Sequence, residues 1–354
     1  MNRELITGNE AIGRAAIDAN CQFYAGYPIT PQNELTAFMA KNMPENQRVF
    51  VQAESELAAI NMVFGASAAG VRAMTSSSSP GVSLKQEGIS YLAGCMLPAV
   101  IINVQRGGPG LGNIGPSQSD YFQATRGGGH GDYRTIVLAP SSVAESYTLT
   151  YLSFSLAEFY RMPVLILSDA IIGQMAESVS LIKPDIAKYA IKNKEWALTG
   201  CKNRKPRVVR SLFLKKGALE QRNLQLQQNY RVIEKEEVRS ETFKTQSAEV
   251  LIIAYGSMFR LVKEIILQLR RQGKKIGGFR PVTLWPFPYR HLSALVRKNK
   301  IKKILVIEMS CGQMLEDVKL SVLDRAKIYF YGRTGGEIPE IKDIISFIKT
   351  RKIA

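Results

Sequence analysis

The sequence is poor in the residues that most often build metal and redox chemistry into a chain. It has four cysteines and two histidines in 354 residues. No two cysteines form a Cys-x-x-Cys pair, so the chain alone predicts neither a zinc site nor an iron–sulfur cluster. We expect reduced structural thiols at all four positions, which are Cys21, Cys95, Cys201 and Cys311.

Long apolar runs are also missing. None approaches the roughly 20 residues that a membrane-spanning helix needs, and MNRELITGNE at the start lacks the apolar centre of a signal peptide. The composition, 45% hydrophobic and 22% charged, is that of a globular chain with enough material for two or three cores. We therefore expect a cytoplasmic protein that does not engage a membrane.

Acidic residues are scarce in the second half of the chain. The net charge of +17 divides into −4 for residues 1–180, +9 for 181–245 and +12 for 246–354. A basic half suggests nucleic-acid binding, but RRQGKK and RKNKIKK have no interleaved aromatics and match no binding motif. Solvated helix ends explain these stretches more simply, and a face that docks an acidic protein is a third interpretation. We expect no nucleic-acid partner.

Helix and strand patterns alternate through residues 1–180. Apolar runs such as VRAMTSSSS, LPAVIINVQRG and MPVLILSDA end in polar or glycine residues and are separated by helical patterns. This alternation predicts an α/β domain with a parallel sheet covered on both faces. Residues 181–245 lose the pattern and predict a linker with a polar helical arm. Strands and helices return in 246–354, which predicts a second, smaller α/β domain.

Four predicted strand ends carry unusual residues. They are the corner at 27–30, the pair Glu54 and Glu56, the serine-rich turn 76–81, and the loop 106–115. Ligands of parallel sheets bind at the carboxyl ends of the strands. We therefore expect the four corners to converge on one crevice.

The first corner, AGYPITPQNE, has two prolines three positions apart. Thr30 is predicted to cap a helix that begins at Pro31, where a missing N–H costs nothing. Pro28 restricts the backbone before that cap. The resulting corner, with Tyr27 and Ile29, is either a stop in the fold or the wall of a site.

The carboxylates of Glu54 and Glu56 flank Ser55, a predicted helix cap. Acidic residues are common at a helix N-terminus, which is the simplest explanation of the pair. The following LAAINMVFGASAAG is so apolar that its helix must pack deeply, so a carboxylate at its start should be partly buried. Buried carboxylates are rare without a partner and often serve proton transfer. In the first helix, NEAIGRAAIDAN, Asn9 is the candidate cap.

Arg106 ends the apolar strand AVIINVQ and places a cation at the sheet edge. A guanidinium fork suits a carboxylate ligand, and a structural salt bridge fits the pattern equally well. The loop RGGPGLGNIG matches neither the P-loop nor the dinucleotide fingerprint. The hydroxyls of TSSSSPG have no basic neighbour, and His130, in the glycine-rich loop 127–134, fits either a ligand contact or an ordinary exposed position.

In order, these stretches resemble a known family. GNEAIGRAAIDAN, GYPITP, ESELAAINMVFGASAAG, TSSSSPG and NVQRGGPG, followed by AYGS and VIEMSCGQ, are similar to the alpha subunit of 2-oxoacid:ferredoxin oxidoreductases. GYPITPQNE and the long stretch from RGGPGLGNIG to GGGHGDYR most resemble the branched-chain form, which acts on 2-oxoisovalerate (3-methyl-2-oxobutanoate). The resemblance implies a thiamine-diphosphate-binding domain of the pyrimidine type, followed by a transketolase C-terminal-like α/β domain.

The resemblance also implies roles for single residues. Glu56 corresponds to the glutamate that hydrogen-bonds the aminopyrimidine ring of thiamine diphosphate and is the expected catalytic residue. Thr30 and Arg106 are implied to bind substrate, Arg106 through the substrate carboxylate. Further cofactor contacts are expected at Tyr27, Pro28, Ile29, Glu54, Ser79 and Gly81, and no metal ligand is expected in this chain.

The implied reaction is the coenzyme-A-dependent oxidative decarboxylation of a 2-oxo acid to acyl-CoA and CO2, with reduction of ferredoxin. The chain lacks the Gly-Asp-Gly metal motif and the cluster-binding cysteines. The diphosphate and Mg²⁺ are therefore expected on a beta subunit and the iron–sulfur clusters on a ferredoxin-like delta subunit. A gamma subunit is typical, and an external ferredoxin is the expected acceptor. The active site would lie between alpha and beta.

Several alternatives stay open at this point. Within the family, a 2-oxoglutarate or pyruvate form competes with the branched-chain form. Outside enzymes, the fold would serve a non-catalytic scaffold or a basic binding module. The joint presence of Glu56, Thr30 and Arg106 argues against a degenerate scaffold.

Overall fold

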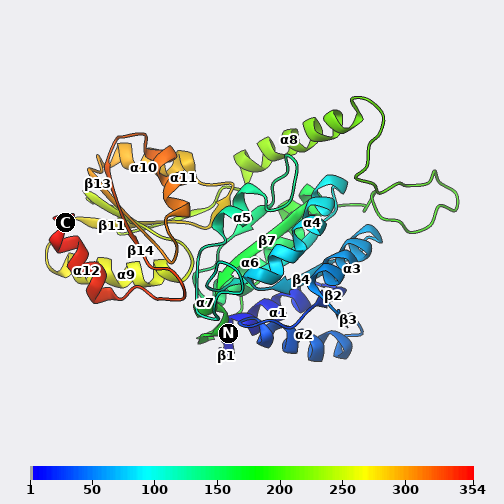
Figure 1. Cartoon of the computed structure of the whole chain (residues 1–354), viewed down its shortest axis with the longest axis horizontal. Coiled ribbons are helices and arrows are strands. Elements are labelled where there is room, and N and C mark those ends of the chain that lie inside the picture. Colours follow the sequence, from blue (N-terminus) through cyan, green and yellow to red (C-terminus); the bar gives the residue numbers. More distant parts are fainter. Residues whose placement is uncertain (1–2) are drawn as a thin grey trace.

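The computed structural model describes residues 3–354 and contains two mainly parallel sheets, each with helices on both faces (Figure 1). The larger sheet has the strand order β12-β6-β7-β5-β4-β2-β3. The predicted α/β fold is confirmed. The strands are β2 (Phe23–Gly26), β3 (Val49–Gln52), β4 (Ala73–Ser77), β5 (Ala99–Gln105), β6 (Ile136–Leu138), β7 (Pro163–Asp169) and β12 (Thr283–Trp285).

Helices of the first half form two layers around this sheet. One layer contains α1, α2 and α6, and the opposite face carries α3 and α4. Strands β5 and β7 at the centre are buried at every residue, as expected for parallel strands covered on both sides. The helices are α1 (Gly8–Asp18), α2 (Asn33–Glu45), α3 (Glu56–Ala68), α4 (Ser79–Cys95), α5 (Tyr121–Arg126), α6 (Val143–Tyr160) and α7 (Ala170–Gln174).

The smaller sheet has the order β14-β13-β10-β11-β9, with α9 and α12 on one face and α10 and α11 on the other. Its amphipathic helices bury the apolar stripe that the sequence pattern indicates. The strands are β9 (Ser240–Phe243), β10 (Val250–Ile253), β11 (Ile276–Pro281), β13 (Lys303–Glu308) and β14 (Lys327–Gly332). The helices are α9 (Gly256–Arg271), α10 (Tyr289–Lys298), α11 (Gln313–Val322) and α12 (Ile341–Thr350).

Two strands tie the halves of the chain together. β12 lies in the C-terminal half of the sequence but pairs antiparallel with β6 of the larger sheet. β9 lies within the segment predicted as linker and arm, 181–245, but pairs antiparallel with β11 of the smaller sheet. The single apolar run KIGGFRPVTLWPFP is therefore divided between the two sheets.

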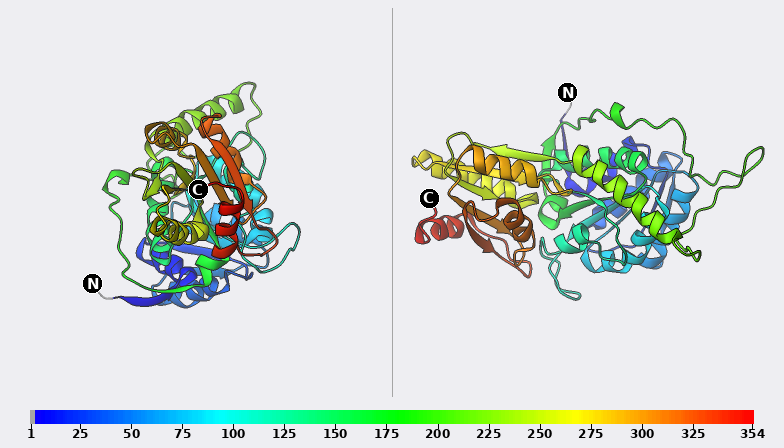
Figure 2. Two further views of the ribbon diagram at one scale, coloured as in Figure 1. Left: turned by 90° about the vertical axis from the view of Figure 1, so that its left-hand side faces the viewer. Right: turned by 90° about the horizontal axis from the view of Figure 1, so that it is seen from above.

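The segment between the two halves is mostly extended and runs along the larger domain to its far end, before α8 (Ala218–Glu236) returns (Figure 2). It begins after β8 (Ala176–Val179), which pairs with β1 (Glu4–Thr7), and contains one short 3-10 helix, Ala187–Tyr189. Trp196 Nε1 donates to Ser67 O at 3.1 Å, and Leu198 N donates to Ala68 O at 2.8 Å. These contacts lie at the end of α3 that is remote from Glu56.

Two predicted helix caps are wrong. α2 begins at Asn33 rather than Pro31, and Thr30 does not cap it. Gln32 N instead donates to Ile29 O at 3.0 Å, so residues 29–32 form a turn before the helix. α1 is capped by Thr7 in a capping box with Glu10. Asn9 lies inside α1, where its Nδ2 donates to Pro31 O at 2.9 Å.

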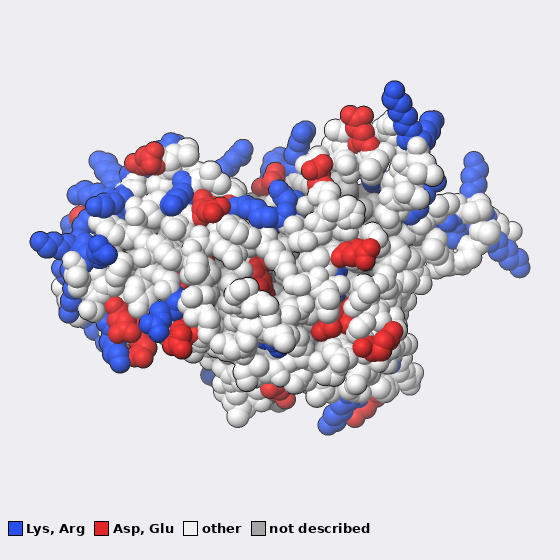
Figure 3. Space-filling model, viewed as in Figure 1, with Lys and Arg blue, Asp and Glu red and all other residues white. Residues whose placement is uncertain are grey.

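Charge is distributed as the sequence predicts. Figure 3 shows Lys and Arg gathered over the C-terminal domain and over the segment that projects beyond α3, whereas the face over the larger domain is mostly uncharged. No helix of the described residues is long and apolar enough to cross a membrane.

Candidate functional site

Glu56 is the first residue of α3, and its side chain is 6% exposed. The predicted cap is confirmed, because Ser55 Oγ accepts a hydrogen bond from Ala58 N at 3.1 Å. The helix after it is apolar and small-residued, so its N-terminus packs into the domain and takes the carboxylate with it. The predicted burial of a carboxylate is therefore found at Glu56. Glu54, by contrast, is exposed.

Gly81 brings the first turn of α4 against this carboxylate. A Cβ at Gly81 would lie 2.4 Å from Glu56 Oε1 and 2.1 Å from Ser77 Oγ. Both distances are far below van der Waals contact, so the position accepts only glycine without a displacement of Glu56. The glycine thus connects the predicted corners at Glu56 and at residues 76–81.

Arg106 connects the other two corners. Its Nη1 donates to Thr30 O at 3.0 Å and its Nη2 to Leu111 O at 3.1 Å. Both acceptors are uncharged backbone carbonyls. These hydrogen bonds therefore do not pair the positive charge of Arg106 with a carboxylate of residues 3–354. Its Nε is buried and has no hydrogen-bond partner there. The guanidinium therefore keeps both charge and donor capacity for a ligand.

Ser79 and Asp120 support the backbone of Arg106. Arg106 N donates to Ser79 Oγ at 3.0 Å, and Ser79 Oγ lies 2.6 Å from Asp120 Oδ2. Asn103 Nδ2 also donates to Asp120, at 2.9 Å. Burial raises the pKa of the Asp120 carboxyl, and the hydrogen bonds from Ser79 and Asn103 oppose the rise. Sequence reasoning missed Asp120, which sits in SQSDYF like any acidic residue before a helix.

A buried polar network holds the Tyr27–Thr30 corner against β4. Ser76 Oγ lies 2.6 Å from Tyr24 Oη and 2.6 Å from Gln32 Oε1. Gln32 Nε2 in turn donates to Tyr27 O at 3.3 Å. The corner is therefore fixed from behind by β2 and β4 and from the side by Arg106. Gln32 was also missed, because a glutamine after Pro31 reads as a surface residue.

The four predicted corners therefore meet at the carboxyl ends of β2, β3, β4 and β5. Ser79 is buried, Ile29 and Thr30 are half-buried, and Tyr27 and Pro28 are exposed at the edge. Among residues 3–354, no hydrogen bond or ion pair brings Glu54 into this cluster, and His130 is exposed in its loop. The roles implied for all these residues stay predictions.

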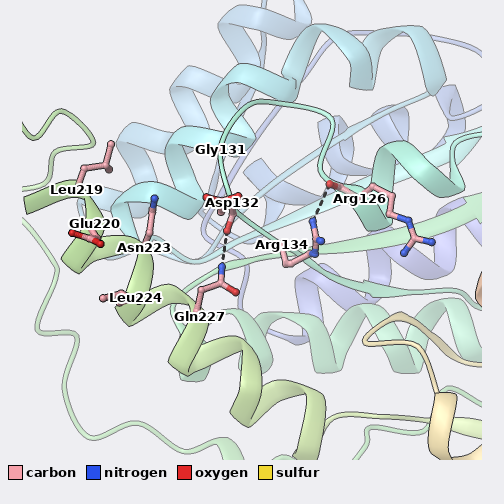
Figure 4. A pocket seen from close by; sticks show the side chains of 9 residues that line it. All are labelled: Arg126, Gly131, Asp132, Arg134, Leu219, Glu220, Asn223, Leu224 and Gln227. Atoms are coloured by element: carbon pink, nitrogen blue, oxygen red, sulfur yellow. Dashed lines mark hydrogen bonds between the residues drawn. The ribbon is translucent and has the colours of Figure 1, made fainter. Parts of the chain in front are cut away.

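A large cavity lies elsewhere, between α8 and the loop 131–134 (Figure 4). Its volume is about 780 Å³, and Gln227 Nε2 donates across its wall to Asp132 O at 2.9 Å. None of the predicted site residues lines it. The volume of this cavity is therefore no guide to the site, because the chemically active side chains gather around Glu56 instead.

Unpartnered atoms show what the cluster around Glu56 can accept. Ser77 Oγ, Ser78 Oγ and Asn103 Oδ1 are buried and have no hydrogen-bond partner among residues 3–354. Buried polar atoms are normally paired, so these hydroxyls and this carbonyl indicate a ligand with both donors and acceptors. An aminopyrimidine ring beside a carboxylate meets that requirement. Residues 3–354 contain no group of three His, Cys, Asp or Glu side chains that could hold a metal ion.

The C-terminal domain closes one side of this region through Gln118. Its Nε2 donates to Tyr255 O at 2.9 Å, and its Oε1 accepts from Met309 N at 3.1 Å. Asn113, in the loop after Arg106, donates to Gly335 O at 2.6 Å. The turns AYGS and EMSCGQ therefore serve as a joint between the domains.

Two family matches cover almost the whole chain. Residues 14–244 match the family described as pyruvate flavodoxin/ferredoxin oxidoreductase, thiamine diP-bdg. Residues 248–344 match the pyruvate:ferredoxin oxidoreductase core domain II. The chain belongs to the 2-oxoacid:ferredoxin oxidoreductases.

Similar proteins support this membership. The chain is 47% identical, over 100% of its own length and 99% of the relative, to ketoisovalerate oxidoreductase subunit VorB of Methanothermobacter marburgensis. It is 40% identical to 2-oxoglutarate synthase subunit KorA of Archaeoglobus fulgidus, over 94% of this chain and 95% of that one. As an oxidoreductase subunit of this family, it is an enzyme component.

Solved structures agree on the fold. A 2-oxoglutarate:ferredoxin oxidoreductase from Magnetococcus marinus, solved with 2-oxoglutarate, coenzyme A and succinyl-CoA, superposes with a TM-score of 0.85 at 28% identity. The match covers 99% of this chain and 65% of that one. A split-gene transketolase matches with a TM-score of 0.60 at 15% identity over 98% of this chain and 97% of that chain, which shows the fold alone. The expected transketolase-like architecture is confirmed.

Proposed function

We propose that this subunit binds the aminopyrimidine end of thiamine diphosphate and the carboxylate of a branched-chain 2-oxo acid. The reaction is coenzyme-A-dependent oxidative decarboxylation, with ferredoxin as electron acceptor. One observation carries the proposal: the buried Glu56 carboxylate, enclosed by Gly81, lies in the same cluster as Arg106. The hydrogen bonds of Arg106 do not pair its positive charge with any carboxylate of residues 3–354. A proton-transfer group and an anion-binding group thus share one sheet edge.

The thiamine cofactor, when bound, supplies the carbon nucleophile and the electron sink that amino-acid side chains lack. The residues of this chain bind and orient. Glu56 holds a proton at a pyrimidine nitrogen, and the burial of its carboxylate strengthens that hydrogen bond. Ser77 and Ser78 offer hydroxyls to the ring substituents. Gly81 leaves free the space beside the carboxylate that a larger side chain would fill.

Arg106 binds the substrate carboxylate in this proposal. Two of its nitrogens already hold Thr30 O and Leu111 O, so the guanidinium plane is fixed before substrate arrives. A pre-oriented fork loses less freedom on binding than a mobile one. Thr30, placed by the same bond, lies beside the bound carboxylate. Tyr27, Pro28 and Ile29 form the adjoining wall, with Ser79 behind Arg106.

The choice of a branched-chain substrate is based on the similarity to VorB and on the apolar surroundings of Arg106. Leu111 is 79% exposed and Ile114 65% exposed in the loop beside the guanidinium. Aliphatic groups there suit the isopropyl group of 2-oxoisovalerate better than the second carboxylate of 2-oxoglutarate. The 2-oxoglutarate form is the second candidate, favoured by the KorA relatives.

Partner subunits complete the site in this proposal. Tyr27, Leu57 and Leu84 expose apolar side chains on the elements that carry the site, with exposed fractions of 40%, 46% and 56%. Such residues around a polar cluster are typical of a protein interface. We assign this face to a beta subunit that holds the diphosphate and Mg²⁺. Iron–sulfur clusters belong to a ferredoxin-like delta subunit, accompanied by a gamma subunit, and the assembly works in the cytoplasm.

The test is an anaerobic assay of the complex that co-purifies with this chain. Reduction of viologen, dependent on coenzyme A, is measured with 2-oxoisovalerate, 2-oxoglutarate and pyruvate. The highest kcat/KM is expected with 2-oxoisovalerate. A preference for 2-oxoglutarate or pyruvate would keep the reaction and change the substrate. No turnover and no co-purifying subunits would favour a non-catalytic scaffold.

A further inference from the structure

Lys85 is a lysine without exposed surface in the helix that closes the site. Its Nζ donates to Thr75 Oγ1 at 2.6 Å and to Ser76 O at 2.9 Å. Fully buried lysines are rare, because an ammonium ion loses its hydration and needs compensating contacts. Two neutral oxygens on β4 compensate only part of that cost, so the residue calls for an explanation beyond packing.

The geometry places the Lys85 amine next to the Glu56 pocket. Lys85 follows Gly81 by four residues in α4, so both lie on one face of the helix. Helical side chains lean toward the N-terminus of their helix, so the Lys85 side chain is directed toward Gly81. Gly81 in turn lies against the Glu56 carboxylate. The acceptor Ser76 O belongs to the residue before Ser77, whose hydroxyl faces the same glycine.

Electrostatics couples the two residues. Burial lowers the pKa of the Lys85 ammonium to about 7, and the negative charge of Glu56 opposes this lowering. Other titratable groups around this end of α4 are engaged with different atoms: Tyr24 from β2 contacts Ser76 Oγ, and Asp120 after β5 contacts Ser79. Arg106 faces Thr30 and Leu111. Glu56 is therefore the charged group whose field acts on Lys85.

We propose that Lys85 is a positioning residue for Glu56: its ammonium is the buried counter-charge of the Glu56 carboxylate and locks the end of β4 beside it. Through Ser76 the same amine is connected to Gln32 and the Tyr27 corner. Lys85 thus orients the Glu56 carboxylate and fixes the strand end beside it. This inference rests on the proposed role of Glu56 in binding thiamine diphosphate.

A double-mutant cycle on cofactor binding tests the proposal. Thiamine diphosphate with Mg²⁺ is titrated by calorimetry into the assembled complex, freed of cofactor by chelation, at pH 6.5. The complexes carry Lys85→Met, Glu56→Gln or both, and Lys41→Met on the exposed face of α2 is the control. Lys85→Met should weaken binding about tenfold when Glu56 is present and less than about twofold in the Glu56→Gln background. Equal losses in both backgrounds would overturn the proposal.

A second measurement covers the case in which Lys85→Met does not assemble. Relative to an unfolded lysine, whose pKa is about 10.4, the folded value of about 7 is lowered. The unfolded chain then binds more protons between these values, so this group makes stability rise as pH rises above 7. Thermal unfolding of the wild-type and Glu56→Gln complexes is compared from pH 6 to 9. Without the negative charge of Glu56 the pKa of Lys85 should fall further, so the rise in stability should begin at lower pH in Glu56→Gln than in wild type. An onset at the same pH in both complexes would overturn the proposal.

The two proposals fail differently. If the wild-type complex takes up no thiamine diphosphate, or Glu56→Gln binds it as well as wild type does, the proposed function is wrong. If Glu56→Gln weakens binding while Lys85→Met acts independently of it, the proposed function stands and only the role of Lys85 is rejected.

Discussion

Each of the two mainly parallel sheets has a buried glutamate at or shortly after the end of one strand. The two glutamates look alike in sequence and differ in their surroundings. Glu308 ends β13 of the smaller sheet and is fully buried; its carboxylate accepts from Ser310 Oγ at 2.7 Å, Met314 N at 3.0 Å and Leu315 N at 2.9 Å. Glu56, after β3 of the larger sheet, faces Gly81 together with the hydroxyl of Ser77, which has no hydrogen-bond partner among residues 3–354. A satisfied carboxylate holds structure together, whereas an enclosed one beside unpartnered polar atoms is available for chemistry.

The largest effect that should separate the two carboxylates is on turnover. Glu56→Gln keeps the shape of the side chain and removes its ability to carry a proton, so kcat should fall ~100-fold or more. The midpoint of thermal unfolding should change little. The assay is viologen reduction by the reconstituted complex, and near-normal kcat would place the proton transfer on another residue.

Gly81→Ala should damage the same site by geometry alone. The added methyl would overlap Ser77 Oγ and Glu56 Oε1, at 2.1 and 2.4 Å, and push the carboxylate away. Turnover should fall roughly 10- to 100-fold, because small misplacements of catalytic groups are costly.

The matched control is Gly94→Ala in the same helix, where the nearest atom to a Cβ is Ser211 Cβ at 3.6 Å. This change should leave turnover unaltered and raise the free energy of unfolding by less than ~1 kcal/mol, because alanine has a higher helix propensity than glycine and Gly94 lies in the last turn of α4. Equal losses in both variants would mean that α4 tolerates no methyl group anywhere.

Glu308→Ala should give the opposite result to Glu56→Gln. Removing the carboxylate leaves the two backbone N–H groups at the start of α11 without their acceptor, which should lower the free energy of unfolding by about 1–3 kcal/mol. Below the new melting temperature, kcat should stay near that of wild type. Chemical denaturation measures the first effect, with the exposed Glu316→Ala on α11 as control, and a tenfold loss of kcat would contradict the assignment of Glu308 to structure.

The smallest effect concerns pH. Burial raises the pKa of Glu308, and its hydrogen bonds oppose the rise. A carboxyl whose pKa is higher in the folded than in the unfolded chain stabilises the fold at pH values below its unfolded pKa. This stabilisation is lost as pH rises through the folded pKa. The stability of Glu308→Gln relative to wild type should therefore improve from pH 5 to pH 8. Thermal unfolding at both values measures the trend, and a constant difference would mean that the hydrogen bonds cancel the effect of burial.

Patterns that depend on one segment were predictable. The period of apolar residues indicated the strands and helices of both halves, and the apolar character of the helix after Glu56 indicated that the carboxylate would be buried. The convergence of the four corners followed from the rule that parallel strands end at one edge. Arg106 at the end of AVIINVQ was found in the same way.

Contacts between distant segments were not predictable. Thr30 was expected to cap α2, but its carbonyl is held by Arg106, 76 positions away, and the helix begins later. Lys85 gave no signal, because a lysine in SLKQEG reads as solvated until the packing of α3 on α4 is known. The exchange of β12 into the larger sheet was hidden because one apolar run supplies strands to both sheets.

That exchanged strand restricts how the polypeptide can be divided. A fragment that stops at residue 245 would lack β12, and β6 would become an open edge with unpaired N–H and C=O groups. A gene split at the junction of the two family matches would therefore produce an aggregation-prone first product. Such a product would fold cleanly only in the presence of the second polypeptide, which would have to donate Thr283–Trp285 across the break.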